Sequence, residues 1–138
     1  MARTVSRLPL LVVCVAALAA GGCGSADRRA DAAAGVAVRL RQAVAAGDGA
    51  TACALLAPET AAELAESPGP TCATAIVAED LPARGAARGA DVYGQWAQVW
   101  LDDDTVFLAA FPGGWRVVAA GCRARGGNEP YDCAVGGS

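Results

Sequence analysis

One cysteine stands where its sulfur is set up for covalent chemistry. Cys23 follows Ala20, Gly21 and Gly22, and the residues after it are again small or polar. Small side chains allow a chain to lie extended in a narrow peptidase cleft, and a cysteine thiolate is a strong nucleophile. The residue types around position 23 therefore predict a processing site with Cys23 as its reactive group.

The residues in front of Cys23 have the pattern of an export signal. Two arginines precede an apolar stretch over 8–20, which is too short to cross a hydrocarbon core of about 30 Å as a permanent helix. The segment resembles the bacterial lipobox, in which Leu is commonest three residues before the cysteine. This chain departs from that pattern, with Ala20 at that position and Leu18 two residues earlier. The resemblance implies a signal peptide over 1–22, a diacylglyceryl group on the Cys23 sulfur and an anchor on the extracytoplasmic face of the cell membrane. The alternative is an ordinary secretory signal cut near Ala20, which leaves an unanchored domain.

The chain expected after cleavage is small and acidic. All eleven basic residues are arginines, and loss of the two in the signal leaves nine against 14 acidic residues, a net charge of −5. Such a domain repels nucleic acid and anionic headgroups, so acyl chains must hold it at the membrane, and no nucleic-acid partner is expected. The remaining 116 residues suffice for one domain. We expect a lipidated Cys23 with a short tether over 23–31, and a single domain over 32–138.

Cys14 lies in the signal, so four cysteines remain for structure: Cys53, Cys72, Cys122 and Cys133. Disulfides persist outside the cytoplasm, and four cysteines allow three pairings. Sequential pairing is favoured because it closes two local loops, each worth about 3 kcal/mol in the chain-entropy model. The alternative is a zinc site, but the spacings contain no C-x₂₋₄-C pair and the chain has no histidine. We therefore expect disulfides, and neither a metal nor another cofactor.

The elements that position these residues begin with helices. Apolar residues at helical spacing start near Asp31, with Arg41 on the polar side, and stop at a Gly-Asp-Gly turn in which Asp48 can cap the next helix. Pro58 suits the first turn of a third short helix that runs towards residue 66. Thr71 can cap a fourth.

After residue 90 the hydrophobic period changes from helical to alternating. Segments rich in aromatic and β-branched residues are separated by short turns, which favours an antiparallel meander with strands over 91–93, 95–101, 105–111 and 115–122. Cys133 can pin the glycine-rich C-terminal stretch to the last strand. The order predicts an α+β fold, with short N-terminal helices packed on a curved antiparallel sheet of about four strands.

Two parts of the chain carry a resemblance to a known fold. They are the helix and turn over 36–56, with Ala-Ala-Gly-Asp at 45–48, and the strand pair 105–108 and 113–122. In these parts the sequence resembles the nuclear-transport-factor-2-like, or cystatin-like, superfamily as it occurs in small actinobacterial lipoproteins. The resemblance implies a sheet curved around a long helix, with a conical cavity used for small ligands, dimer contacts or, occasionally, catalysis. The string of short helices departs from that pattern and implies a small or absent cavity.

The strand over 95–101 carries the main candidate for ligand binding. Strand geometry sends Trp96, Gln98 and Trp100 to one face, where two indoles flanking an amide could stack flat rings or sugars. Tyr93 belongs to the same candidate site. The alternative is that the indoles fill the space between the sheet and the helices. Both interpretations stay open from the sequence.

The remaining acidic residues point to no firm chemistry. The run 102–104 is three aspartates without the following Glu of a calcium loop, so a solvated turn is expected. Catalytic members of the resembling superfamily place an Asp base and a Tyr donor in the cavity, parts that Asp91 and Tyr93 could take. No third group is identifiable, and no catalytic residue is assigned.

The expected function is therefore that of a non-enzymatic, membrane-anchored envelope lipoprotein. It would act as an interaction or accessory domain with an envelope protein as a possible partner. The first alternative is a carrier that binds a small ligand on the tryptophan face. The second is a cavity enzyme of the isomerase or hydrolase type.

Overall fold

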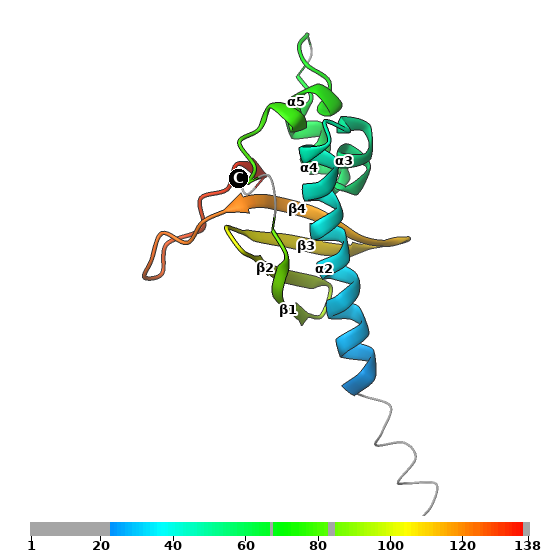
Figure 1. The fold of residues 1–138 in the computed structure, drawn as a ribbon, viewed down its shortest axis with the longest axis vertical. Helices are drawn as coiled ribbons and strands as arrows, with labels where there is room; N and C mark the ends of the chain where they lie inside the picture. The colour runs from blue at the N-terminus through cyan, green and yellow to red at the C-terminus, as the bar shows by residue number, and fades with distance from the viewer. Residues whose placement is uncertain (1–22, 67, 83–84, 137–138) are drawn as a thin grey trace, which may run out of the picture.

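The computed structural model describes residues 23–66, 68–82 and 85–136, so the predicted signal peptide at 1–22 lies outside the described residues. Helices precede an antiparallel sheet whose strands follow one another in chain order, which confirms the α+β class (Figure 1). The helices are α2 (Cys23–Ala45), α3 (Gly49–Leu55), α4 (Pro58–Leu64) and α5 (Cys72–Ala78). The strands are β1 (Ala87–Tyr93), β2 (Trp96–Leu101), β3 (Thr105–Phe111), β4 (Gly114–Cys122) and β5 (Val135–Gly136). None of the helices in this part of the chain is long and apolar enough to span a membrane.

Helix α2 begins at Cys23, earlier than the apolar periodicity predicts. Arg29 ties its N-terminal turns to the sheet, because the guanidinium lies 5.2 Å from the ring centroid of Trp115 and donates to the carbonyl oxygen of Gly94 at 2.6 Å. This cation–π contact and hydrogen bond hold a stretch that has few buried side chains of its own. The segment predicted as a tether over 23–31 therefore forms part of α2.

The short helices begin where their capping residues predict. The Asp48 carboxylate accepts from the backbone N–H of Thr51 at 3.1 Å, which starts α3 and lowers the pKa of Asp48. Pro58 opens α4, and the Thr71 hydroxyl accepts from the N–H of Thr74 at 3.3 Å to start α5. These contacts satisfy backbone donors that a helix leaves unpaired at its first turn. Helix α4 ends at Leu64, slightly before the predicted residue 66.

The core lies between α2 and one face of the sheet, across which α2 runs (Figure 1). Alternate strand residues point towards α2 and are buried, as the period of two predicts. They meet an apolar stripe on α2 and apolar residues of α3 and α5. The largest fully buried side chains are Leu40, Ile76, Val99, Val106, Leu108, Cys122, Val117 and Val135.

Two charged side chains are buried where solvated ones were expected. Arg41 and Asp104 form an ion pair, and their side chains are 2% and 1% exposed. Arg41 also donates to the carbonyl oxygen of Pro82 at 2.6 Å, and the Asp104 carboxylate accepts from the N–H of Gly121 at 2.9 Å. The prediction of a solvated turn is therefore wrong for Asp104, and Arg41 does not lie on a solvent-facing side of α2.

The C-terminal stretch returns to the sheet and adds a fifth strand. Disulfides join Cys53 to Cys72 and Cys122 to Cys133, in agreement with sequential pairing. The first links α3 to α5. The second holds the return segment 123–134 at the end of β4, and β5 then pairs with Ala119 and Ala120. The segment after β4 is thus fixed at both ends.

Candidate binding site on the outer face of the sheet

The four predicted ligand-binding residues all lie on the face of the sheet that points away from α2, called the outer face here. Within β2, Ala97, Val99 and Leu101 are buried on the α2 side, so Trp96, Gln98 and Trp100 take the other side. In the antiparallel register Tyr93 pairs with Trp96, which places Tyr93 on the outer face as well. Alternation along the strand therefore predicts the shared face of Trp96, Gln98 and Trp100, and the register of β1 with β2 adds Tyr93 to it.

The interpretation of the two tryptophans as core residues is wrong. The Trp96 side chain is 58% exposed, and Trp100 is half-buried on the outer face beside Gly89, where an added Cβ would meet its ring at 3.4 Å. Trp115 on β4 is the tryptophan that joins the core. The core needs no further indole because branched aliphatic residues already fill the space below α2.

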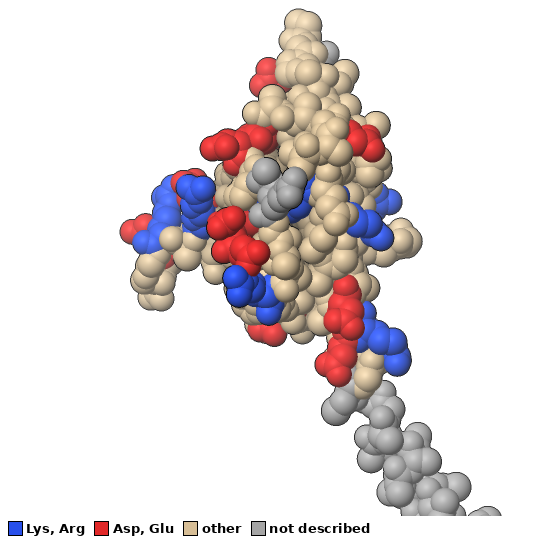
Figure 2. Space-filling model, viewed as in Figure 1, with Lys and Arg blue, Asp and Glu red and all other residues tan. Residues whose placement is uncertain are grey.

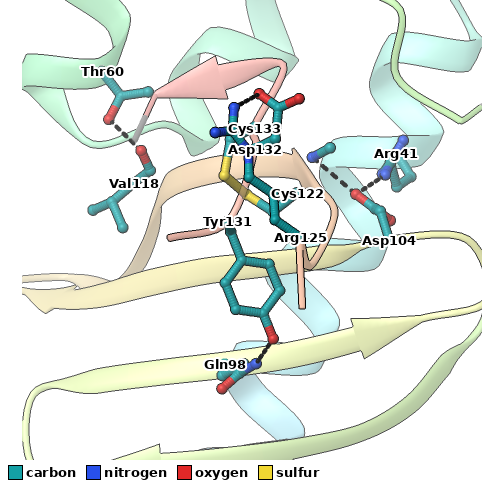
Figure 3. The surroundings of a disulfide bond; sticks show 11 residues. Arg41, Thr60, Gln98, Asp104, Val118, Cys122, Arg125, Tyr131, Asp132 and Cys133 are labelled. Atoms are coloured by element: carbon teal, nitrogen blue, oxygen red, sulfur yellow. Dashed lines mark hydrogen bonds and ion pairs between the residues drawn. A yellow bond between two sulfur atoms is a disulfide. The ribbon is translucent and has the colours of Figure 1, made fainter. Parts of the chain in front are cut away.

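A tyrosine from the return segment packs onto the same face. The Tyr131 hydroxyl accepts from Nε2 of Gln98 at 3.2 Å (Figure 3). The Tyr131 ring also meets the Phe107 ring edge-on, with centroids 5.0 Å apart. Cys133, two residues on, is bonded to Cys122 at the end of β4. The disulfide thus holds the segment that carries Tyr131 over β2 and β3.

Tyr131 and α4 form the two walls of a groove of about 470 Å³ on the outer face. Its floor contains Trp96 and Phe107, and the α4 side contributes Glu59 and Glu63. The groove combines flat aromatic surface with two carboxylates, the kind of mixed lining that small-molecule sites use. Of the predicted set, Trp96 lines the groove directly, and Gln98 acts through its hydrogen bond to Tyr131.

A β-bulge fixes the position of α4. Phe107 on β3 pairs with Ala119 on β4, and the next residue, Leu108, pairs with Val117. Val118 is therefore an extra residue of β4 that has no partner on β3. The Val118 carbonyl oxygen accepts from the buried hydroxyl of Thr60 on α4 at 3.1 Å (Figure 3). This bond turns the side of α4 that bears Glu59 and Glu63 towards the groove.

Asp91 and Tyr93 form an exposed pair. The Tyr93 hydroxyl donates to the Asp91 carboxylate at 3.0 Å, and this bond raises the pKa of Tyr93. Neither residue lines the groove. Both residues lie open to solvent on β1.

The three aspartates of the turn 102–104 have different surroundings. Asp102 pairs with Arg88, and this bond together with the N–H of Ala86 lowers the pKa of Asp102. Asp103 is exposed, and Asp104 is the buried partner of Arg41. Within the described ranges no group of three potential metal ligands occurs. The three carboxylates therefore do not converge.

Of the groove residues, the sequence predicts Trp96 alone as a ligand-binding candidate, and it gives no such role to the carboxylates and rings of Glu59, Glu63, Phe107 and Tyr131. Tyr131 was detectable, because it lies two residues before a cysteine expected to bond at the end of the last strand. No pattern in the sequence indicates that Glu59 and Glu63 lie at the groove. Their position depends on the docking of α4 at the Val118 bulge.

Comparisons with known proteins provide no relative for this chain. No protein-family model matches it, no curated protein matches it, and no solved structure matches its fold.

Proposed function

We propose that this protein is a non-enzymatic lipoprotein domain, anchored outside the cytoplasm through Cys23, that binds a small ligand on the outer face of the sheet. One observation carries the binding proposal: Trp96 is exposed on the outer face and forms part of an aromatic groove. An indole that is absent from the core and faces a concave surface is costly to leave in water. A bound ligand that covers it removes that cost.

Two features support the anchored, extracytoplasmic location. The residues in front of Cys23 match an export signal that ends in a modifiable cysteine. The other cysteines of the described residues are paired in two disulfides, which persist in oxidising compartments. The charged side chains on the face shown in Figure 2 form mixed acidic and basic groups, so this face offers no broad basic patch for anionic lipids.

We propose further that the fold is nuclear-transport-factor-2-like. The long helix α2, which crosses an antiparallel meander of strands in chain order, supports it. The helix-facing side of the sheet is filled by buried side chains, including Val99 and Leu108. We therefore place ligand binding on the opposite face, where the groove lies.

Lipid labelling tests the anchor. We expect cells that express the full chain to incorporate radiolabelled palmitate into it, and Cys23→Ser to abolish the label because the acyl-bearing sulfur is lost. Cys14→Ser, which changes the other cysteine of the signal region, is the matched control and keeps the label. A labelled Cys23→Ser variant, or an unlabelled parent, refutes the anchor.

Tryptophan emission tests the binding site. A library of metabolites is screened against the purified domain, and a true ligand changes the emission of the parent and of Trp100→Phe but loses its effect on Trp96→Phe. Trp100 is the control because it lies on the same face outside the groove. If effects persist in Trp96→Phe, the ligand binds elsewhere and the proposed site is wrong.

A protein partner is the second candidate function, because large aromatic groups extend past the groove. Tyr93 is 60% exposed next to Trp96. Exposed aromatic residues of this kind often dominate the binding energy of protein interfaces. Capture of one envelope protein by the anchored parent but not by Tyr93→Ala would favour this candidate over the small ligand.

A further inference from the structure

We propose that the groove on the outer face selects a small organic cation, such as an ammonium or guanidinium compound. The inference rests on the proposed small-ligand function and adds the chemical class of the ligand. Three properties of the groove support it: the negative charge, the aromatic rings and the volume.

The charge of the groove is negative. Glu59 and Glu63 are the charged residues among those that line it, and neither forms an ion pair with another described residue. Arg125, the nearest basic residue along the return segment to Tyr131, does not line the groove and pairs with Asp132. Arg116 lies on the same face of the sheet, but its guanidinium donates to the carbonyl oxygen of Ala54 and does not line the groove. Among the lining residues a cation would therefore meet two carboxylates and no basic side chain, whereas an anion would be repelled.

Helix stability does not explain both carboxylates. Glu59 lies in the first turn of α4, where a negative charge is favourable beside the N-terminal end of the helix dipole. Glu63 lies next to the last residue of the same helix, where a negative charge opposes the dipole. The position of Glu63 thus disfavours the helix locally, and recognition of a cation supplies a reason for it.

The rings of the groove suit the same ligand. Trp96, Phe107 and Tyr131 present aromatic surface in one concave site. An organic cation within about 6 Å of such a ring centroid is attracted by the quadrupole of the ring, and quaternary ammonium ligands are recognised in this way. The protein already uses the interaction at Arg29 and Trp115. Aromatic rings with nearby carboxylates favour a cation over a neutral sugar.

The volume indicates a small molecule as the occupant. The groove measures about 470 Å³. Small-molecule sites have volumes of roughly 300–1,000 Å³, and the groove falls at the lower end of that range.

The experiment compares cations with neutral molecules of the same shape. Choline is titrated against its isostere 3,3-dimethylbutan-1-ol, and butylguanidinium against butylurea, while the indole N–H signal of Trp96 is followed by NMR. The signal is assigned with Trp96→Phe. We expect at least one cation to shift the Trp96 signal saturably, and its neutral isostere to leave the signal in place.

Paired variants identify the source of the selectivity. Glu59→Gln with Glu63→Gln should weaken binding of the cation by about tenfold or more, an effect of about 1.4 kcal/mol. Glu66→Gln with Asp103→Asn makes the same change in net charge at exposed positions outside the groove and should leave the affinity within about twofold. Both double variants keep the side-chain shapes, and an unchanged amide spectrum shows that they fold.

The outcomes separate this inference from the proposed function. If neutral isosteres shift Trp96 as strongly as the cations, or if both pairs of variants weaken binding equally, selectivity for cations is wrong while ligand binding at the groove stands. If none of the four probes shifts Trp96, cation recognition is also overturned, and the metabolite screen then decides the wider function independently.

Discussion

Asp103 and Asp104 are identical neighbours in one turn, yet their surroundings differ completely. Asp103 is exposed, whereas Asp104 is buried against Arg41. Nε of Arg41 and Oδ1 of Asp104 have no hydrogen-bond partner among the described residues, so the pair depends on its direct contact and on two backbone groups. Removal of one buried charge leaves the other without its counter-charge, which costs more than the pair itself contributes.

We predict that Asp104→Asn lowers the free energy of unfolding by about 3 kcal/mol, because Arg41 stays buried without a counter-charge. Asp103→Asn is the matched control and should change it by less than about 0.5 kcal/mol. Urea denaturation followed by circular dichroism measures both. Equal effects of the two substitutions would show that the ion pair is not as buried as described.

The hydrogen bond between Asp91 and Tyr93 can be tested through its dependence on pH. The hydrogen bond from Tyr93 to Asp91 raises the pKa of Tyr93. The stability from this bond is fully present below the unfolded tyrosine pKa of about 10, and it is lost as the pH rises through the folded pKa. Asp91→Asn removes the acceptor charge and should lower the pKa of Tyr93.

Tyrosinate absorbance measures that pKa, with Tyr131→Phe as the background so that Tyr93 is the tyrosine observed. We expect the titration of Tyr93 to move to lower pH when Asp91→Asn is added. A titration that stays in place would mean that Asp91 and Tyr93 are not bonded in solution.

At the scale of elements, the two disulfides perform different tasks. Cys53–Cys72 joins two short helices across 19 residues and lies away from the groove. Cys122–Cys133 closes 11 residues, and Cys133 lines the groove next to the segment that carries Tyr131. Chain entropy assigns them nearly the same stabilisation, about 3 kcal/mol each. Only the second should therefore affect the binding face.

We predict that Cys122→Ala with Cys133→Ala frees Tyr131 from the outer face, whereas Cys53→Ala with Cys72→Ala does not. Both pairs should lower the free energy of unfolding by about 3 kcal/mol. The side-chain amide signals of Gln98 report the bond to Tyr131, and they should move towards those of the Tyr131→Phe variant in the first pair alone. If both pairs move these signals, the loss is general and not local to the return segment.

At the scale of the whole molecule, α2 separates the proposed anchor from the groove. A helix of 23 residues is about 35 Å long. Cys23 begins it, and α4, one wall of the groove, lies at its other end (Figure 1). Arg29 holds the first turns of α2 against the sheet, so the helix and the sheet form one packed unit. With the anchoring that we propose, the groove would be held away from the membrane surface.

Local patterns in the sequence predict the class of fold and the starts of the short helices, and they favour the sequential pairing of the cysteines. These features depend on local causes: alternation along a strand, a capping side chain such as Asp48 or Thr71, and the shortness of the loops that sequential disulfides close. The shared face of Trp96, Gln98 and Trp100 follows from the same alternation, whereas Tyr93 joins it through the register of β1 with β2.

Which face of the sheet the helices cover depends on long-range packing. Alternation divides a strand into two sides but does not say which side is buried, and both sides of β2 carry large apolar groups. The burial of Arg41 with Asp104, and the meeting of Glu59, Glu63 and Tyr131 over Trp96, likewise join residues from distant parts of the chain. Contacts of this kind follow from how α2, α4 and the return segment dock on the sheet, and no local pattern encodes them.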